Sequence, residues 1–167
     1  MTTSITIPTA STINWRTTYA ETIINAPRQT VWDALINFDN YDAWNTFTYD
    51  VDMPRFAVGE EFSFMVKLGA NERRQREHIT AIEAPYMLAW RYPSETIFLK
   101  ATRYQVLTDI DDGQTRYQTW ETFSGLFTPI LWLTVLESVQ IGFNTVAQDL
   151  KRHCEKNLDD QIRFSIN

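Results

Sequence analysis

The chain has few of the residues that most often carry nucleophilic or metal-binding chemistry. It contains one cysteine, Cys154, and two histidines, His78 and His153, in 167 residues. A lone cysteine excludes an intrachain disulfide, and no spacing of metal ligands is present. Cys154 directly follows His153 in a predicted helix, where adjacent side chains do not face each other. A packing or surface role for Cys154 is therefore favoured over a catalytic Cys–His pair, and we predict no metal site.

Positive charge and long apolar runs are also scarce. Lysine and arginine number 15 against 21 acidic residues, which gives a formal net charge of −6. This balance disfavours nucleic acid and anionic membrane surfaces as partners, because phosphate binding needs clustered basic residues. No apolar stretch approaches the roughly 20 residues that a membrane span needs, and the first residues lack a signal-peptide pattern. The sequence therefore predicts a cytoplasmic protein without membrane insertion.

The length and the aromatic content are informative. A chain of 167 residues suits one domain with a substantial core. Aromatic residues make up 14% of it, so there are enough rings both to fill that core and to line a pocket. We expect a loose extension rich in threonine and serine over residues 1–13, one domain over 14–157, and a tail over 158–167.

The segment 19–45 has an unusual order of elements. Residues 19–24 alternate with the period of two that is typical of a strand. Pro27 ends this strand and suits the first turn of a helix, because its φ is fixed and it lacks an N–H group. Helical spacing of apolar residues then follows, beginning at Val31 and Trp32 and ending at Phe38. A short second helix rich in aromatic residues is predicted before Asn45.

The remainder reads as a β-meander followed by one long helix. Alternating patterns separated by turn residues predict strands at 47–53, 60–68, 72–82, 87–92, 97–107 and 115–123. Asp111-Asp112-Gly113 is a hairpin signal between the last two strands. After Pro129, an apolar stripe at helical spacing predicts a helix of about 28 residues, roughly 42 Å long. Its members are Trp132, Leu136, Val139, Phe143, Val146 and Leu150.

These motifs resemble a known superfamily. Ile24-Asn25-Ala26-Pro27, Val31-Trp32, Phe38-Asp39, Tyr41 and Trp44-Asn45 look like the opening of START-like, or SRPBCC, proteins, which include polyketide cyclase/dehydrase proteins and birch-pollen-allergen-like ligand carriers. Gly142-Phe143-Asn144 resembles the closing helix of that family. The resemblance covers residues 14–157 and implies an α+β helix-grip fold. In that fold a curved antiparallel sheet of about seven strands, with two short helices after the first strand, wraps around a long C-terminal helix and leaves a cavity.

A cavity in this fold would be mostly apolar with a few polar groups. The number of aromatic rings favours a pocket for a flat, partly aromatic ligand, although plain core packing is the alternative for each ring. The candidate ligand-binding residues are Trp44, Tyr49, Phe62, Phe64, Trp90, Tyr117, Trp120 and Phe143.

The most unusual polar stretch is Asn71–His78. Alternation places Arg74, Arg76 and His78 on one strand face, and Arg73 on the other face beside Gln75 and Glu77. If the first face looks inward, it supplies cationic donors for a carbonyl, enolate or carboxylate. The family's aromatase/cyclases carry an arginine on the corresponding strand, which supports that choice by resemblance. The register stays open, because Ile79 and Ile82 break the alternation and suggest a bulge. The alternative is a solvated face with cross-strand ion pairs.

Two further candidates lie on the last strands. Glu121 is in phase with Tyr117, so burial on an aromatic face would raise its pKa and suit it as a general base. The alternative places Glu121 on the outer face while Trp120 points inward. Tyr104 would donate its hydroxyl to a carbonyl, or would simply pack.

These residues lead to three hypotheses of function. The first is an enzyme that resembles polyketide cyclases and promotes cyclisation, dehydration or isomerisation of an aromatic or polyketide-like molecule. Arg74, Arg76, His78 and Tyr104 would then polarise a carbonyl, and Glu121 or His78 would move the proton. Such chemistry needs no cofactor. The second is a non-catalytic carrier or sensor of a lipid or another apolar small molecule, and the third is a partner-binding module. The sequence leaves homodimer formation open.

Overall fold

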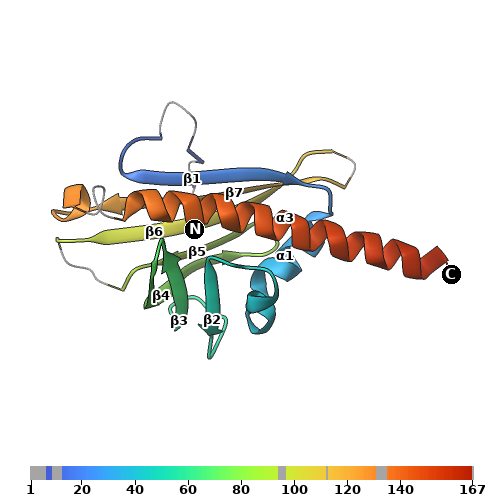
Figure 1. Ribbon diagram of the computed structural model, residues 1–167, viewed down its shortest axis with the longest axis horizontal. Helices are drawn as coiled ribbons and strands as arrows, with labels where there is room; N and C mark the ends of the chain where they lie inside the picture. Colours follow the sequence, from blue (N-terminus) through green and yellow to red (C-terminus); the bar gives the residue numbers. More distant parts are fainter. Residues whose placement is uncertain (1–6, 9–12, 94–96, 112, 131–134, 167) are drawn as a thin grey trace.

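A seven-stranded antiparallel sheet curls around one long helix in this computed structural model, which describes residues 7–8, 13–93, 97–111, 113–130 and 135–166 (Figure 1). The strands follow the order β1-β7-β6-β5-β4-β3-β2 across the sheet. Their bounds are β1 Thr17–Ile24, β2 Thr48–Asp52, β3 Glu61–Leu68, β4 Asn71–Glu83, β5 Met87–Arg91, β6 Lys100–Asp109 and β7 Thr115–Ser124. The helix-grip architecture predicted from the sequence is confirmed.

The two short helices follow β1, as predicted. Pro27 stands at the N-cap of α1 (Arg28–Ile36), with a φ of −58° that already suits a helical start. The apolar residues at helical spacing, Val31, Trp32 and Leu35, are the buried face of α1. The second helix, η1 (Phe38–Ala43), is a 3-10 helix.

The long helix α3 runs from Leu136 to Ile166 and has 31 residues. Its apolar stripe is buried, and Phe143, Val146 and Leu150 are each at most 2% exposed. Trp132, the predicted start of the stripe, lies outside the described residues. The segment 158–167, predicted as a tail, is continuous with α3 as far as Ile166. No helix in the described ranges is long and apolar enough to cross a membrane.

Side-chain hydrogen bonds hold α3 over the sheet. The Gln140 side chain exchanges two hydrogen bonds with the backbone of Tyr19 on β1, at 2.6 and 3.0 Å. Further along α3, the Asp149 carboxylate accepts hydrogen bonds from the Thr46 amide at 3.0 Å and the Thr46 hydroxyl at 2.7 Å. Because these contacts attach the helix near both edges of the sheet, they fix the distance that the intervening side chains must span.

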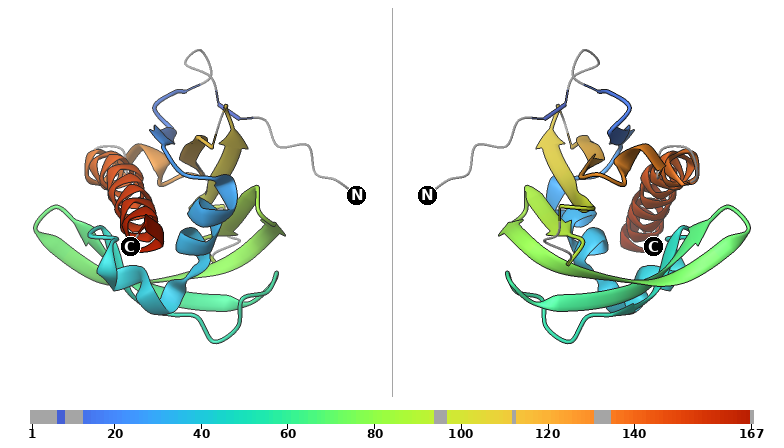
Figure 2. Two further views of the ribbon diagram at one scale, coloured as in Figure 1. Left: turned by 90° about the vertical axis from the view of Figure 1, so that its right-hand side faces the viewer. Right: turned by 90° about the vertical axis from the view of Figure 1, so that its left-hand side faces the viewer.

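The core fills this space unevenly. Leu150 and Cys154, in the second half of α3, share a core cluster with Trp32 of α1 and Trp44, which follows η1. Figure 2 shows the sheet curling around α3, with the short helices at the same end as the C-terminal half of α3. Beside the first half of α3, the smaller core cluster of Ala101, Phe123 and Leu136 fills less of this space, and a cavity remains there.

Candidate functional site

The cavity lies between the concave face of the sheet and the first turns of α3. Its volume is about 150 Å³. A cavity of roughly this size in another protein holds one benzene molecule, so one ring fits here. The lining residues are Phe47, Thr48, Phe64, Val66, Leu68, Arg73, Gln75, Glu77, Trp90, Tyr92, Leu99, Ala101, Arg103, Glu121, Phe123, Val135, Leu136, Val139 and Phe143.

The register of β4 sends three polar side chains into the cavity. Arg73 pairs with Val66 of β3, and Gln75 pairs with Phe64. Partners in an antiparallel pair share a face, and Val66 and Phe64 belong to the buried face of β3. Arg73, Gln75 and Glu77 therefore point inward. Arg73 is the most exposed of them and reaches the cavity from its mouth, whereas Glu77 is only 4% exposed.

Arg103 on β6 is the most buried positive charge of the site. Its side chain is 5% exposed, and its guanidinium carbon lies 4.2 Å from the ring centre of Phe143 and 5.4 Å from that of Trp90. These two rings hold the guanidinium by cation–π contacts. Nε donates to the Thr119 hydroxyl at 3.2 Å, but the buried Nη2 has no partner in the described part of the protein. A buried donor without a partner costs free energy, which a ligand acceptor would recover.

Glu77 faces the cavity with one oxygen unpartnered. Its Oε1 accepts a hydrogen bond from the Gln75 amide at 3.1 Å, and its buried Oε2 has no partner among the described residues. Burial, followed by the charge of Glu121, raises the pKa of Glu77 to about 9, against the lowering effects of Gln75, Arg103 and Arg73. Glu77 is therefore a neutral acid at pH 7 and can donate a hydrogen bond to a ligand.

Glu121 on β7 is the direct cross-strand partner of Arg103. Burial raises the pKa of Glu121 to about 7, while Arg103 and then Arg73 act to lower it. A carboxyl group that titrates near neutral pH exchanges a proton readily in either direction, which is the property required of a general base.

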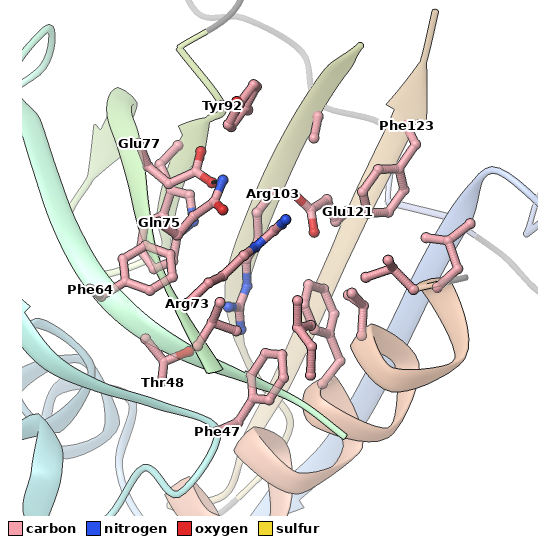
Figure 3. A pocket seen from close by; sticks show the side chains of 18 of the residues that line it. Phe47, Thr48, Phe64, Arg73, Gln75, Glu77, Tyr92, Arg103, Glu121 and Phe123 are labelled. Carbon is pink, nitrogen blue, oxygen red and sulfur yellow. Dashed lines mark hydrogen bonds between the residues drawn. The ribbon is translucent and has the colours of Figure 1, made fainter. Parts of the chain in front are cut away.

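These four ionisable groups surround one volume. Figure 3 shows the Arg73 and Arg103 side chains reaching between Glu77 and Glu121, with Phe64 and Phe123 on either side. The cavity thus combines an apolar body with hydrogen-bond donors, a neutral acid and a base. This arrangement can bind a small molecule that has a carbonyl or an oxyanion, and it can move a proton at that group.

Arg74, Arg76 and His78 do not line the cavity, because they alternate with the inward residues of β4. Arg74 donates to the backbone carbonyl of Asp50 at 2.9 Å and also pairs with the Asp50 carboxylate. His78 Nε2 lies 3.6 Å from Glu61 Oε2. The face that we considered as a source of cationic donors is therefore the outer face, so Arg74, Arg76 and His78 do not reach a ligand in this cavity.

Tyr104 and Trp120 also lie on the outer face. They are cross-strand partners, and their rings stack with centres 5.1 Å apart and planes 19° apart. Their sequence neighbours Arg103 and Glu121 point inward instead. Of the two placements considered for Glu121, the structure thus has the inward one.

Of the predicted ligand-binding rings, Phe64, Trp90 and Phe143 line the cavity. Phe62, Tyr117 and Trp44 belong to the core beyond it. Two of these core residues have contacts of their own. The Tyr117 hydroxyl donates to Gln105 Oε1 at 2.7 Å, and the Trp44 ring packs edge-on against the Tyr41 ring, with centres 4.7 Å apart.

Tyr49 lies away from the cavity. Its hydroxyl donates to the exposed Glu72 carboxylate at 2.7 Å. Its ring also contacts Lys67, whose ammonium lies 5.2 Å from the ring centre.

Arg103 was missed in reasoning from the sequence, although a signal for it is present. The hairpin signal in the sequence predicts the pairing of β6 with β7, in which Asp109 opposes Thr115. Counting away from that turn, one residue on each strand at a time, places Arg103 opposite Glu121. An inward Glu121 would therefore have placed Arg103 on the same inward face.

Within the described ranges, no cluster of three or more histidine, cysteine or carboxylate side chains could hold a metal ion.

Comparison with known proteins supports the fold. No protein-family model matches the sequence, and no curated protein matches it. Among solved structures, the hypothetical protein jhp0584 from Helicobacter pylori matches with a TM-score of 0.69 and 17% identity, over 92% of this chain and 99% of that one.

Two other matching structures are described as aromatase/cyclases. ZhuI from Streptomyces sp. R1128 has a TM-score of 0.63 and 14% identity, over 82% of this chain and 94% of that one. The di-domain protein BexL from the BE-7585A biosynthetic pathway has a TM-score of 0.65 and 11% identity, over 82% of this chain and 45% of that one. The chain therefore shares its helix-grip fold with these proteins, as the resemblance of its motifs predicted, and at these identities the likeness is one of fold.

Proposed function

We propose that this protein binds a compact carbonyl compound in the cavity and transfers a proton at the carbon next to the carbonyl. The observation that carries the proposal is that Arg103 on β6 lies directly opposite Glu121 on β7, with both side chains lining a mostly apolar cavity. Enolisation of this kind is the step shared by the cyclisation, dehydration and isomerisation reactions that the resemblance to polyketide cyclases suggests. The two aromatase/cyclases among the structural matches support that choice of chemistry.

The reaction follows from the roles of three residues. The Glu121 carboxylate takes a proton from the carbon next to the carbonyl, and the electron pair of that C–H bond forms a carbon–carbon double bond. The carbonyl oxygen becomes an oxyanion, which accepts a hydrogen bond from Arg103 Nη2. The neutral carboxyl group of Glu77 donates a second hydrogen bond. Return of the proton from Glu121 to the same or another carbon completes an exchange or an isomerisation.

The rate acceleration that each group can contribute is limited by typical values for enzymes. A positioned general base typically accelerates proton transfer by about 10²–10⁴-fold. One preorganised donor to a developing oxyanion contributes about 10²–10³-fold. These effects are strongest where water is excluded, and Glu77 and Arg103 are only 4% and 5% exposed.

The cavity volume restricts the substrate. About 150 Å³ accommodates one ring or a short chain. We therefore propose a compact substrate, and a polyketide-like molecule would place only a ring-sized portion beside Arg103.

The test is hydrogen–deuterium exchange of two small ketones, cyclohexanone and phenylacetone, in D₂O followed by proton NMR. We expect the protein to accelerate exchange beside the carbonyl above the buffer rate for at least one ketone. Glu121→Gln should return that rate to the buffer level. Glu137→Gln, which changes an exposed carboxylate on α3, is the matched control and should leave the rate unchanged. No acceleration by the native protein, or full activity of Glu121→Gln, would overturn the proposal.

A second candidate function is a non-catalytic carrier of an apolar molecule. It is favoured by the lining itself, in which apolar side chains outnumber polar ones. Mass spectrometry of an organic extract of the purified protein distinguishes the two. A carrier should retain one apolar compound in stoichiometric amount and should not accelerate ketone exchange.

A further inference from the structure

Two arginines reach the cavity without forming an ion pair there. Among the described residues, ion pairs within 4.0 Å involve Arg74 on the outer face of the same strand, but neither Arg73 nor Arg103. Arg103 is nevertheless 5% exposed, and a buried charge without a partner is costly. The site thus has an unmet requirement for negative charge.

The carboxyl groups of the cavity do not meet this requirement. Burial keeps Glu77 neutral at pH 7, because its pKa is raised to about 9. Glu121, with a pKa near 7, carries a full negative charge only above neutral pH. Two guanidinium groups therefore face at most one carboxylate, and the cavity is positive overall. This contrasts with the whole chain, whose formal net charge is −6.

The geometry of Arg103 defines what can approach it. The Phe143 and Trp90 rings lie against the guanidinium at 4.2 and 5.4 Å, and Nε is committed to Thr119. The remaining N–H groups lie in the guanidinium plane, and the buried Nη2 among them has no partner within the described ranges. An in-plane edge with free donors is the geometry that matches a carboxylate.

We propose that the ligand of this cavity is a compact organic anion, with a carboxylate head bound by Arg103 and Arg73 and an apolar body against Phe64, Phe123 and Phe143. Nη2 of Arg103 carries two N–H groups, so one can donate to this head while the other donates to the carbonyl oxygen, to which Glu77 also donates. This inference rests on the proposed function, since it assigns a carboxylate to the carbonyl compound on which the site acts. A ligand of this charge supplies the negative group that the described residues do not.

Equilibrium binding of benzoate and benzamide tests this inference. The two molecules have nearly the same shape, one ring fits the cavity, and only benzoate is charged. Binding is measured at pH 7 by titration calorimetry, with the change in total tryptophan fluorescence, to which Trp90 at the cavity wall contributes, as a second readout. We expect benzoate to bind at least tenfold more tightly than benzamide.

Two variants connect that preference to the arginines. Arg103→Met retains apolar contact with Phe143 and Trp90 but lacks the charge, and it should weaken benzoate binding at least tenfold while changing benzamide binding less than twofold. Arg73→Met, at the exposed mouth of the cavity, should weaken benzoate binding by a smaller factor without a risk to folding. Arg74→Met on the outer face of β4 is the matched control and should bind benzoate as the native protein does.

Equal binding of the two molecules by the native protein, or no measurable binding of benzoate, would overturn the inference whatever the variants do. So would an unchanged preference for benzoate in both Arg73→Met and Arg103→Met. Benzoate has no hydrogen on a carbon next to a ketone, so its binding is independent of catalysis. A protein that prefers benzoate but fails to accelerate ketone exchange would refute only the proposed function.

Discussion

Gly142 offers a sharp test of how α3 meets the wall of the cavity. A Cβ atom at this position would lie 2.1 Å from Cε2 of Phe47 and 2.3 Å from Cδ2 and Cζ. The Phe47 ring is 6% exposed and packs edge-on against Phe143, with centres 6.4 Å apart. The ring therefore lies against the helix backbone at Gly142, where no side chain stands in its way.

The substitution Gly142→Ala brings two opposing effects. Alanine is favoured over glycine inside a helix by about 1 kcal/mol. Displacing a packed ring to admit a methyl group costs about 1–3 kcal/mol. We therefore expect Gly142→Ala to lower the free energy of unfolding by up to about 2 kcal/mol, although the same change in an unobstructed helix would raise it. The displaced Phe47 ring should also narrow the cavity and weaken benzoate binding.

The assay is urea unfolding of a double-mutant cycle. In a Phe47→Ala background the obstruction is absent, so Gly142→Ala should stabilise the protein by about 1 kcal/mol. The two backgrounds should thus differ by about 1–3 kcal/mol in the effect of the same substitution. Gln148→Ala, at an exposed position of α3, is the control and should shift stability by less than about 0.5 kcal/mol. Stabilisation by Gly142→Ala with Phe47 present would show that the ring does not obstruct a side chain at this position.

Two further predictions concern buried titratable groups. The pKa of Glu77 is about 9 in the folded protein against an ordinary value of 4.5, so folding takes up a proton between these pH values. In that range, each unit by which the pH rises should lower the free energy of unfolding by up to about 1.4 kcal/mol through this group. Urea unfolding at pH 5, 7 and 9 should show a shallower decline for Glu77→Gln than for the native protein, and parallel declines would contradict the burial of this charge. Cys154 is 1% exposed, and burial raises the pKa of its thiol to about 12. At pH 8 it should resist a thiol-modifying disulfide reagent in the folded protein and react as one equivalent after unfolding, whereas fast reaction of the native protein would show an accessible thiolate.

The fold follows from local signals because those signals agree with one another. Pro27 ends a strand and begins a helix, and the helix that contains Phe143 and Val146 has one apolar face to bury. Few arrangements of the elements satisfy both conditions. The short turns of the meander then impose antiparallel neighbours. The order of the elements and their antiparallel pairing do not depend on which face of a given strand points inward, so the fold could be predicted without that information.

The site depends on that choice of face, and there the sequence is ambiguous. Both faces of β4 carry an arginine, Arg73 inward and Arg74 outward, and a shift of one residue exchanges them. The register shift between Ile79 and Ala81 separates this part of the strand from the apolar residues that would have fixed its phase. The apolar character of Trp120 did not reveal its face either. Trp120 is only 2% exposed although it lies on the outer face, where it stacks with Tyr104.

Both proposals depend on a cavity that holds a neutral Glu77 and a Glu121 that titrates near neutral pH, beside two arginines. Carbon-13 NMR titration of the glutamate side-chain carboxyl groups tests it directly, with the two signals assigned through Glu77→Gln and Glu121→Gln. We expect midpoints of about 9 for Glu77 and about 7 for Glu121. Midpoints for both between about 4 and 5, as for carboxyl groups in water, would contradict it.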